Sequence, residues 1–430
     1  MIEYLIVFVA LVCMVIGTPL FIILAIITLC CVQFLGDGML AEMIADMFNA
    51  VNKDVLLAIP FFLIAGQIMT HGTIAKRLID FAKSIVGWLP GGLAVTTIFA
   101  CLFFAAISGS SPVTVIAIGT MMYPALIKEN YKEDFSIGLL TSAGSLGILI
   151  PPSIPMIIYA IVVSTSANII SVADLFIAGV VPGLLIGLLL MIYSVITQKG
   201  HTTETTSKFS FDQFKNSFKE GILALILPII ILGGIYSGFF TPTEAAAVAV
   251  VYTFIVEVFI HKDIKIKKIP EIIIQSTSMM GTLFLIIVIA ISFNQFLALE
   301  RIPYQAALWM KSFVHSSIMF LIVVNIFLLI LGCFMDIMSA ILIVGPLLGP
   351  MAIEFGIDPV HFAIIFIVNM EIGYLTPPMG INLFVSSSIF EKKIGYVIKS
   401  TIPFTLILLF ALILISYIPG ISMFLVEMFR

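Results

Sequence analysis

The chain has 430 residues, of which 61% are hydrophobic and 10% are charged, and its formal net charge is −4. Soluble domains carry about 25% charged residues, so this composition excludes a soluble globular protein and a disordered chain. The charge balance shows no basic excess and excludes a typical nucleic-acid binder. The five cysteines lie in apolar runs without zinc-site or disulfide spacing, and we interpret them as packing residues.

The lipid bilayer is the solvent that suits such a chain, and a spanning helix needs about 17–25 apolar residues. Two of the apolar runs, 91–127 and 318–353, are too long for one span and carry small or polar residues at their middle. We predict that each forms a hairpin that enters the membrane and leaves on the same side. Each of the other ten runs predicts one span. With the two hairpins included, the twelve apolar runs in chain order are 4–16, 19–35, 55–70, 91–127, 135–163, 173–197, 221–240, 243–261, 269–296, 318–353, 360–390 and 396–417.

The distribution of lysine and arginine tests this count. If the N-terminus lies outside, sixteen of these residues fall on the inner side and four on the outer side, as the positive-inside rule expects. Both termini are therefore predicted to lie on the outer side of the membrane. The outer residues are Lys53, Arg301, Lys311 and Arg430.

The two halves of the chain repeat each other at a shift of 226 residues. Pro124 meets Pro350, Gly147 meets Gly373, and the proline pair at 151–152 meets the pair at 377–378. Each half has five spans and one hairpin, and because five is odd the second half is inverted in the membrane. Inverted-topology repeats are typical of secondary transporters, whose site lies near the midplane between the repeats.

The sequence thus predicts an all-α polytopic membrane protein with this domain order. The first repeat is 1–200, with scaffold helices 4–70, a cytoplasmic arm helix 73–86, hairpin 91–127, broken helix 135–163 and helix 173–197. Residues 201–220 are a cytoplasmic linker that ends in a surface helix. The second repeat is 221–430, with helices 221–296, an arm 303–314, hairpin 318–353, broken helix 360–390 and helix 396–417.

The first hairpin tip reads Ser108-Gly109-Ser110-Ser111-Pro112-Val113-Thr114. Glycine permits a tight turn and proline favours the start of the returning helix. The N-terminus of that helix presents free N–H groups and a positive dipole end, which suit a carboxylate. The alternative is a Ser/Gly face for helix packing.

The second tip, 332–340, contains Asp336. A carboxylate at membrane depth is costly and normally meets a cation, a proton or a helix N-terminus, and all three remain open for Asp336. Runs 142–155 and 369–382 are interrupted by the proline pairs, which leave backbone carbonyls free for a small cation; a simple proline kink is the alternative. Glu371 either faces the cavity or hydrogen-bonds the break.

Other chemistry is not predicted. The five histidines lie near span ends or in loops without metal-ligand spacing, so we expect no transition-metal site and no organic cofactor. No base is available to activate Ser110, so the chain is not expected to be an enzyme. A phosphate-binding glycine loop is also missing from the sequence, which argues against ATP as the energy source. Thr241 and Glu244 have capping-box spacing.

The chain resembles the large membrane subunit of tripartite ATP-independent periplasmic (TRAP) transporters. The residues that carry the resemblance are the 108–114 tip, Gly147-Ile148-Leu149-Ile150-Pro151-Pro152-Ser153-Ile154-Pro155, the run 369–384 and the Gly17-Thr18-Pro19 break. The resemblance implies an elevator architecture of the ion-transporter superfamily in the bacterial inner membrane. It also implies sodium-driven import of an organic anion, with a separate small four-helix membrane subunit and a periplasmic binding protein as partners.

By the same resemblance, the sodium-binding residues are expected to be Ser108, Ser110, Ser111, Gly144, Gly147, Asp336, Gly373, Thr376 and Gly380. Since no arginine lies in the apolar runs, we expect helix ends and polar side chains to hold the anion, with Ser110, Thr114, Ser153, Ser339 and Asn382 as candidates. The run 371–378 resembles the C4-dicarboxylate branch more than the sialic acid branch. The alternatives are a sialic acid permease and a stand-alone sodium-coupled anion transporter or channel of related fold.

Overall fold

The structure is a computed structural model. It describes residues 20–34, 40–164, 168–198 and 210–429, with a few isolated positions between 6 and 18. The predicted span 4–16 and the linker residues 201–209 therefore lie largely or wholly outside the described residues. Every regular element in the described part is helical, which confirms the predicted all-α class.

The described helices include two, over 40–51 and 420–429, that no predicted run or arm covered. The helices of the first half are α2 (Leu20–Phe34), α3 (Leu40–Val51), α4 (Ala58–His71), α5 (Ile74–Val86), α6 (Gly92–Ser108), α7 (Ser111–Lys128), α8 (Glu133–Ser145), α9 (Ile154–Val163) and α10 (Val172–Thr197). Those of the second half are α11 (Phe211–Tyr236), α12 (Pro242–Phe254), α13 (Ile269–Leu299), α14 (Ile302–Lys311), α15 (Ser317–Gly332), α16 (Ile337–Glu354), α17 (Pro359–Gly373), α18 (Ile381–Ile389), α19 (Ile394–Tyr417) and α20 (Gly420–Phe429).

Eight of the described helical segments are long and apolar enough to cross a membrane. Two of them, Ser111–Lys128 and Ile337–Glu354, are the returning arms of the two hairpins, whose first arms are shorter. Length and hydropathy alone therefore do not separate a spanning helix from a hairpin arm. The turn between the arms distinguishes them.

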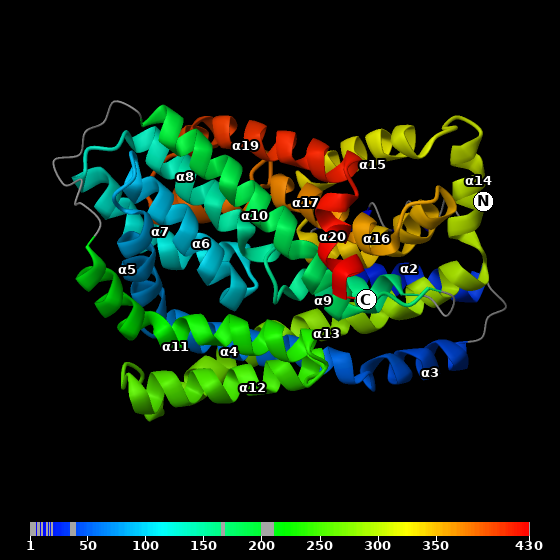
Figure 1. The fold of residues 1–430 in the computed structure, drawn as a ribbon. Helices are drawn as coiled ribbons and strands as arrows, with labels where there is room; N and C mark the ends of the chain where they lie inside the picture. Colours follow the sequence, from blue (N-terminus) through cyan, green and yellow to red (C-terminus); the bar gives the residue numbers. More distant parts are fainter. Residues whose placement is uncertain are drawn as a thin grey trace.

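The helices form two groups. Helices α4, α11, α12 and α13 form one layer, in which α12 packs on α4 and α11, α13 packs on α4, and α2 and α3 pack against α13 (Figure 1). The hairpins, the broken helices and α10 and α19 form the other part. The arm helix α5 packs on both α11 and α6, so it joins the two groups. Its buried face includes Ile74, Leu78 and Phe81, the apolar positions of an amphipathic helix.

The repeats pack reciprocally. Helix α9 packs on α16 of the second hairpin, and its counterpart α18 packs on α7 of the first hairpin. Likewise α8 packs on α19, and α17 packs on α10. Each half thus completes the core of the other, as expected of an inverted repeat.

The linker differs in one respect from the predicted separate surface helix. Residues 211–220 form the first turns of α11, which continues without interruption to Tyr236. The ring centroids of Phe214 and Phe218 lie 6.1 and 6.0 Å from that of Phe81 on α5. This aromatic packing fixes the polar turns on the arm helix and makes one long helix favourable.

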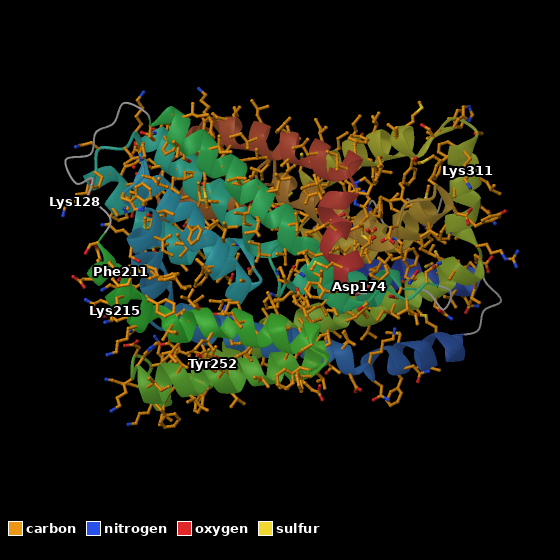
Figure 2. The ribbon with its side chains drawn as sticks, in the orientation of Figure 1. Lys128, Asp174, Phe211, Lys215, Tyr252 and Lys311 are labelled. Carbon is orange, nitrogen blue, oxygen red and sulfur yellow. The ribbon has the colours of Figure 1, made fainter. Side chains whose placement is uncertain are left out.

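The charged ends of the molecule agree with the predicted sides of the membrane. Lys128 and Lys215, both assigned to the inner side, lie at one end, and Lys311, assigned to the outer side, lies at the opposite end (Figure 2). Which end faces the cytoplasm stays a prediction from the positive-inside rule.

Candidate functional site

The first hairpin tip is a tight turn held by its own hydroxyls. Helix α6 ends at Ser108, Gly109 takes a left-handed φ of 56°, and α7 begins at Ser111 with Pro112 in its first turn. The hydroxyls of Ser108 and Thr114 lie 2.9 Å apart, and that of Thr114 donates to the Ser110 carbonyl at 2.9 Å. The Ser110 side chain makes no cap bond, so it leaves the first N–H groups of α7 to another acceptor.

The second tip is capped by its carboxylate. Asp336 Oδ2 accepts from the backbone N–H groups of Met338 and Ser339 at 2.9 and 3.1 Å. The Ser339 hydroxyl donates to Oδ1 of Asp336. Asp336 is thus an N-cap, one of the alternatives that the sequence left open. Each carboxylate oxygen has further acceptor capacity, so the cap does not exclude a cation.

Each broken helix lies directly against the tip of its own repeat. An ideal Cβ at Gly147 would lie 2.5 Å from the Ser110 carbonyl oxygen, and one at Gly109 would lie 2.7 Å from that of Pro152. In the second repeat, a Cβ at Gly373 would lie 2.6 Å from Gly332 Cα. These glycines therefore permit a close backbone approach that any side chain would prevent.

Side-chain hydrogen bonds join the two repeats across the buried centre. Ser145 Oγ donates to Glu371 Oε1 at 2.8 Å, and these residues stand 226 positions apart, the repeat shift itself. Asn382 Nδ2 donates to Ser111 Oγ at 2.7 Å, so the second broken helix reaches the first tip. Glu371 and Asn382 are fully buried. The two breaks and the first tip thus belong to one polar cluster inside an apolar layer.

The structure places the remaining predicted residues on the same elements. Ser153 Oγ donates to the Ile148 carbonyl and Thr376 Oγ1 to the Ile372 carbonyl, so both satisfy the broken ends. Gly144 is packed against Val115, and Gly380 lies against the carbonyls of Tyr374 and Thr376. No lysine or arginine is among the buried polar side chains of the described residues.

Sequence reasoning did not single out several polar residues beside this cluster. Asn369 Nδ2 donates to Asn325 Oδ1 at 2.8 Å, and Asn325 in turn donates to Ser416 Oγ at 3.1 Å. The Tyr374 hydroxyl accepts from the Ile337 backbone N–H at 3.4 Å, just after the second tip. A lone amide within the apolar run 318–353 was the available signal for Asn325.

Glu371 gives a first test of the cluster. Replacing it by alanine breaks the buried hydrogen bond from Ser145, whose hydroxyl keeps the Ser142 carbonyl as its acceptor at 2.7 Å, and costs about 0.5–1.5 kcal/mol of unfolding free energy for the lost bond. Glutamine keeps an acceptor oxygen, so Glu371→Gln is expected to unfold near the wild-type temperature. Thermal unfolding of both variants in detergent measures this difference. Equal loss in both variants would show that the negative charge, rather than the hydrogen bond, is required.

Two inverted repeats, each with a hairpin tip against a broken helix, are typical of membrane transporters. The chain belongs to the tripartite ATP-independent periplasmic transporters: the family model described as "Tripartite ATP-independent periplasmic transporter, DctM component" matches residues 7–421. Its family is thus a transporter family rather than an enzyme family, and the chain is the permease component of a multi-pass membrane system.

Similar proteins agree with this assignment. The C4-dicarboxylate TRAP transporter large permease protein DctM of Pseudomonas aeruginosa is 46% identical over 377 residues, which cover 88% of this chain and 87% of that protein. The protein of the same name from Rhodobacter capsulatus is 42% identical over 388 residues, 88% of each chain. The crystal structure of the Alcanivorax borkumensis YdaH transporter superposes with a TM-score of 0.68 at 15% identity and covers 90% of each chain, which supports the fold alone.

Proposed function

We propose that this chain is the permease subunit of a sodium-driven importer of a small organic anion, with a C4-dicarboxylate as the substrate class. The observation that carries the proposal is the pair of tip-and-break contacts at Gly147 and Gly373. Together they supply carbonyls, hydroxyls and a carboxylate, the oxygen ligands that a small hard cation prefers. The sodium ion is the expected coupling ion, and the residues expected to hold it are those carried over from the family.

The anion has no buried basic side chain to bind it within the described residues. The start of α7 has no side-chain cap at Ser110, so it supplies free backbone N–H groups. The side-chain amide of Asn382 lies next to them, because it donates to the hydroxyl of Ser111, the first residue of α7. A helix N-terminus of this kind binds carboxylates, and a neighbouring sodium ion would add positive charge. The names of the Pseudomonas and Rhodobacter relatives favour a C4-dicarboxylate over sialic acid.

The transport step is proposed to be an elevator movement of the hairpins and broken helices against the layer of α4, α11, α12 and α13. The arm helix α5 lies at the boundary between the two parts, because it contacts α11 of one and α6 of the other. The partners are a separate small four-helix membrane subunit and a periplasmic substrate-binding protein. The proposed location is the bacterial inner membrane, with both termini in the periplasm.

Reconstitution tests the proposal. The chain, its small subunit and its binding protein are placed in liposomes, and uptake of labelled succinate, malate and sialic acid is measured with and without an inward sodium gradient. We expect dicarboxylate uptake that requires both the gradient and the binding protein. Uptake of sialic acid alone would overturn the substrate class. Uptake that persists without sodium would overturn the coupling ion, and uptake without the binding protein would favour a stand-alone transporter.

A further inference from the structure

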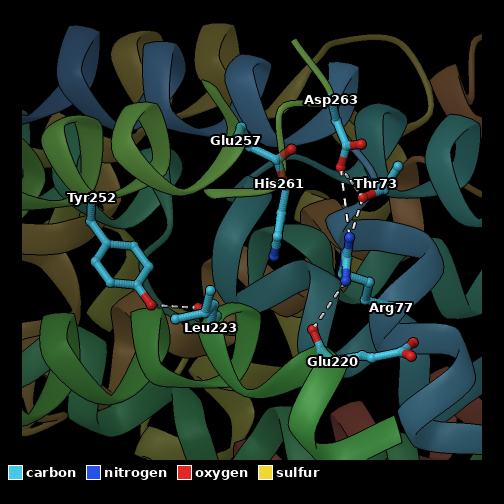
Figure 3. Close-up of polar contacts among 8 residues, drawn as sticks. All are labelled: Thr73, Arg77, Glu220, Leu223, Tyr252, Glu257, His261 and Asp263. Carbon is cyan, nitrogen blue, oxygen red and sulfur yellow. Dashed lines mark hydrogen bonds and ion pairs between the residues drawn. The ribbon is translucent and has the colours of Figure 1, made fainter. Parts of the chain in front are cut away.

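A second polar cluster lies away from the hairpin tips, at the end of α12. This helix passes into a π-helical turn over Ile255–Ile260, and the chain then leaves it through His261 and Asp263. Single π turns frequently mark functional sites. The start of α5 lies directly beside this turn, with Thr73 and Arg77 facing it (Figure 3).

Glu257 is unusual among the acidic residues because it is fully buried and neither of its carboxylate oxygens has a hydrogen-bond partner. An ideal Cβ at Gly72 would lie 2.1 Å from Glu257 Oε2, so the carboxylate occupies space that only glycine leaves open. The backbone N–H groups of Thr73 and Ile74 are near it, but none reaches hydrogen-bond geometry. A buried carboxylate without a partner is costly and calls for a cation or a proton.

His261 points toward the same place. Its Nδ1 lies 3.8 Å from Glu257 Oε1, and this nitrogen also lacks a hydrogen-bond partner. The side chain of His261 is 7% exposed, whereas that of Asp263 is 25% exposed. The cluster is therefore closed on the Glu257 side and open to solvent at Asp263, which leaves a route of entry for an ion and a water molecule.

Asp263 is held from the arm helix. Thr73 Oγ1 donates to Asp263 Oδ2, Arg77 Nη2 lies 3.9 Å from the same oxygen, and Arg77 Nε donates to Thr73 Oγ1 at 3.1 Å. Arg77 also reaches the Glu220 carbonyl on α11 at 3.5 Å (Figure 3). One donor atom each from Glu257, His261 and Asp263 lies within 4.8 Å of the others.

We propose that Glu257, His261 and Asp263 form a binding site for a divalent transition-metal ion of the Zn²⁺ class. One imidazole nitrogen and two carboxylate oxygens, with a water as the fourth ligand, are a common zinc ligand set. Bonds of about 2.0–2.2 Å require donor atoms about 3.4 Å apart in a tetrahedron, so a movement of roughly 1–1.5 Å closes the site. The two carboxylates, of Glu257 and Asp263, outnumber the one guanidinium, of Arg77, so the net charge around the site favours a cation.

Thr73 and Arg77 complete the arrangement as outer-shell partners of Asp263, the role that hydrogen-bonded neighbours of metal ligands usually have. A bound ion would therefore connect the end of α12 to the first turn of the arm helix α5. Because Gly72 has no side chain, the Glu257 carboxylate can approach the joint between α4 and α5. The site departs from the sequence-based expectation of no transition metal, and it does not depend on the proposed function.

The test uses the purified full-length chain in detergent, stripped with a chelator, and Zn²⁺ alone as the probe. Isothermal titration is expected to show saturable binding of one Zn²⁺, and Zn²⁺ is expected to raise the thermal unfolding temperature. Glu257→Gln and His261→Asn each remove one ligand with little change of shape, and each is expected to weaken binding by more than about ten-fold. His315→Asn is the matched control, because His315 is an exposed histidine in the connection between α14 and α15, outside the cluster.

A second variant keeps the test decisive if a ligand substitution impairs folding. His261→Cys replaces the imidazole by a thiolate, which prefers soft metals, so Cd²⁺ binding is expected to tighten relative to wild type. Co²⁺ should give the intense visible absorption of a tetrahedral site in the wild type and lose it in Glu257→Gln. No saturable Zn²⁺ binding by the wild type, or wild-type affinity for Zn²⁺ in both Glu257→Gln and His261→Asn, would overturn the proposal and leave Glu257 as a neighbour of the α5 N-terminus only.

Discussion

Gly147→Ala is expected to lower transport strongly while the chain still folds and inserts. The added Cβ would lie 2.5 Å from the Ser110 carbonyl oxygen and 2.7 Å from Thr114 Oγ1, which is closer than such atoms approach. Backbone carbonyls cannot rotate away as a flexible side chain can, so the first tip must move off its broken helix. Overpacking of this kind costs about 1–3 kcal/mol. If that cost falls on the transport-competent arrangement, uptake decreases by about ten-fold or more.

Gly233→Ala is the matched control, because a Cβ at Gly233 would meet nothing within 4 Å. Alanine also favours the helix by about 1 kcal/mol over glycine, so this variant should transport normally. Gly373→Ala repeats the test in the second half, where the added Cβ would lie 2.6 Å from Gly332 Cα. Sodium-driven uptake in liposomes is the measurement. Normal uptake by Gly147→Ala and Gly373→Ala would show that the close contacts are not needed for transport.

Local signals allowed the hairpin tips to be predicted. The Gly-Ser-Ser-Pro order at 109–112 specifies a left-handed residue, an N-cap position and a helix start, and α6 and α7 meet there. The Thr241 and Glu244 capping box is equally local, and the structure confirms it. Such features depend on residues within one turn of each other. The sequence therefore contains all the information needed to predict them.

Contacts between distant segments were not predictable in the same way. The Ser145–Glu371 bond joins residues at the repeat shift, yet the sequence alone left Glu371 undecided between a cavity and a break. The Thr73–Asp263 bond joins residues 190 positions apart with no repeat to relate them. The three proposed metal ligands, Glu257, His261 and Asp263, lie within seven residues, so their spacing was a local signal that the sequence reasoning missed. The tertiary structure adds Gly72, Thr73 and Arg77, which lie beside these ligands at the joint between α4 and α5.

Asp336→Asn is expected to lower the sodium dependence of transport without unfolding the second hairpin. The wild-type carboxylate accepts from the N–H groups of Met338 and Ser339. Asparagine keeps a carbonyl oxygen and is as good an N-cap as aspartate, so α16 should begin at the same residue. It removes the negative charge that a cation at this tip would require. Asp336→Ala removes both functions and is expected to cost about 1 kcal/mol of stability as well.

Asp358 is a control that separates helix capping from the proposed sodium binding. It caps α17 in the same way, by accepting from Val360 and His361, but it lies outside both tips and both breaks. Asp358→Asn should therefore leave the sodium concentration for half-maximal uptake unchanged, whereas Asp336→Asn should raise it by about ten-fold or more, the effect of losing roughly 1.4 kcal/mol of binding free energy. A wild-type sodium response in Asp336→Asn would assign Asp336 to helix capping alone. The sodium ligands would then have to come from the carbonyls and hydroxyls of the two breaks.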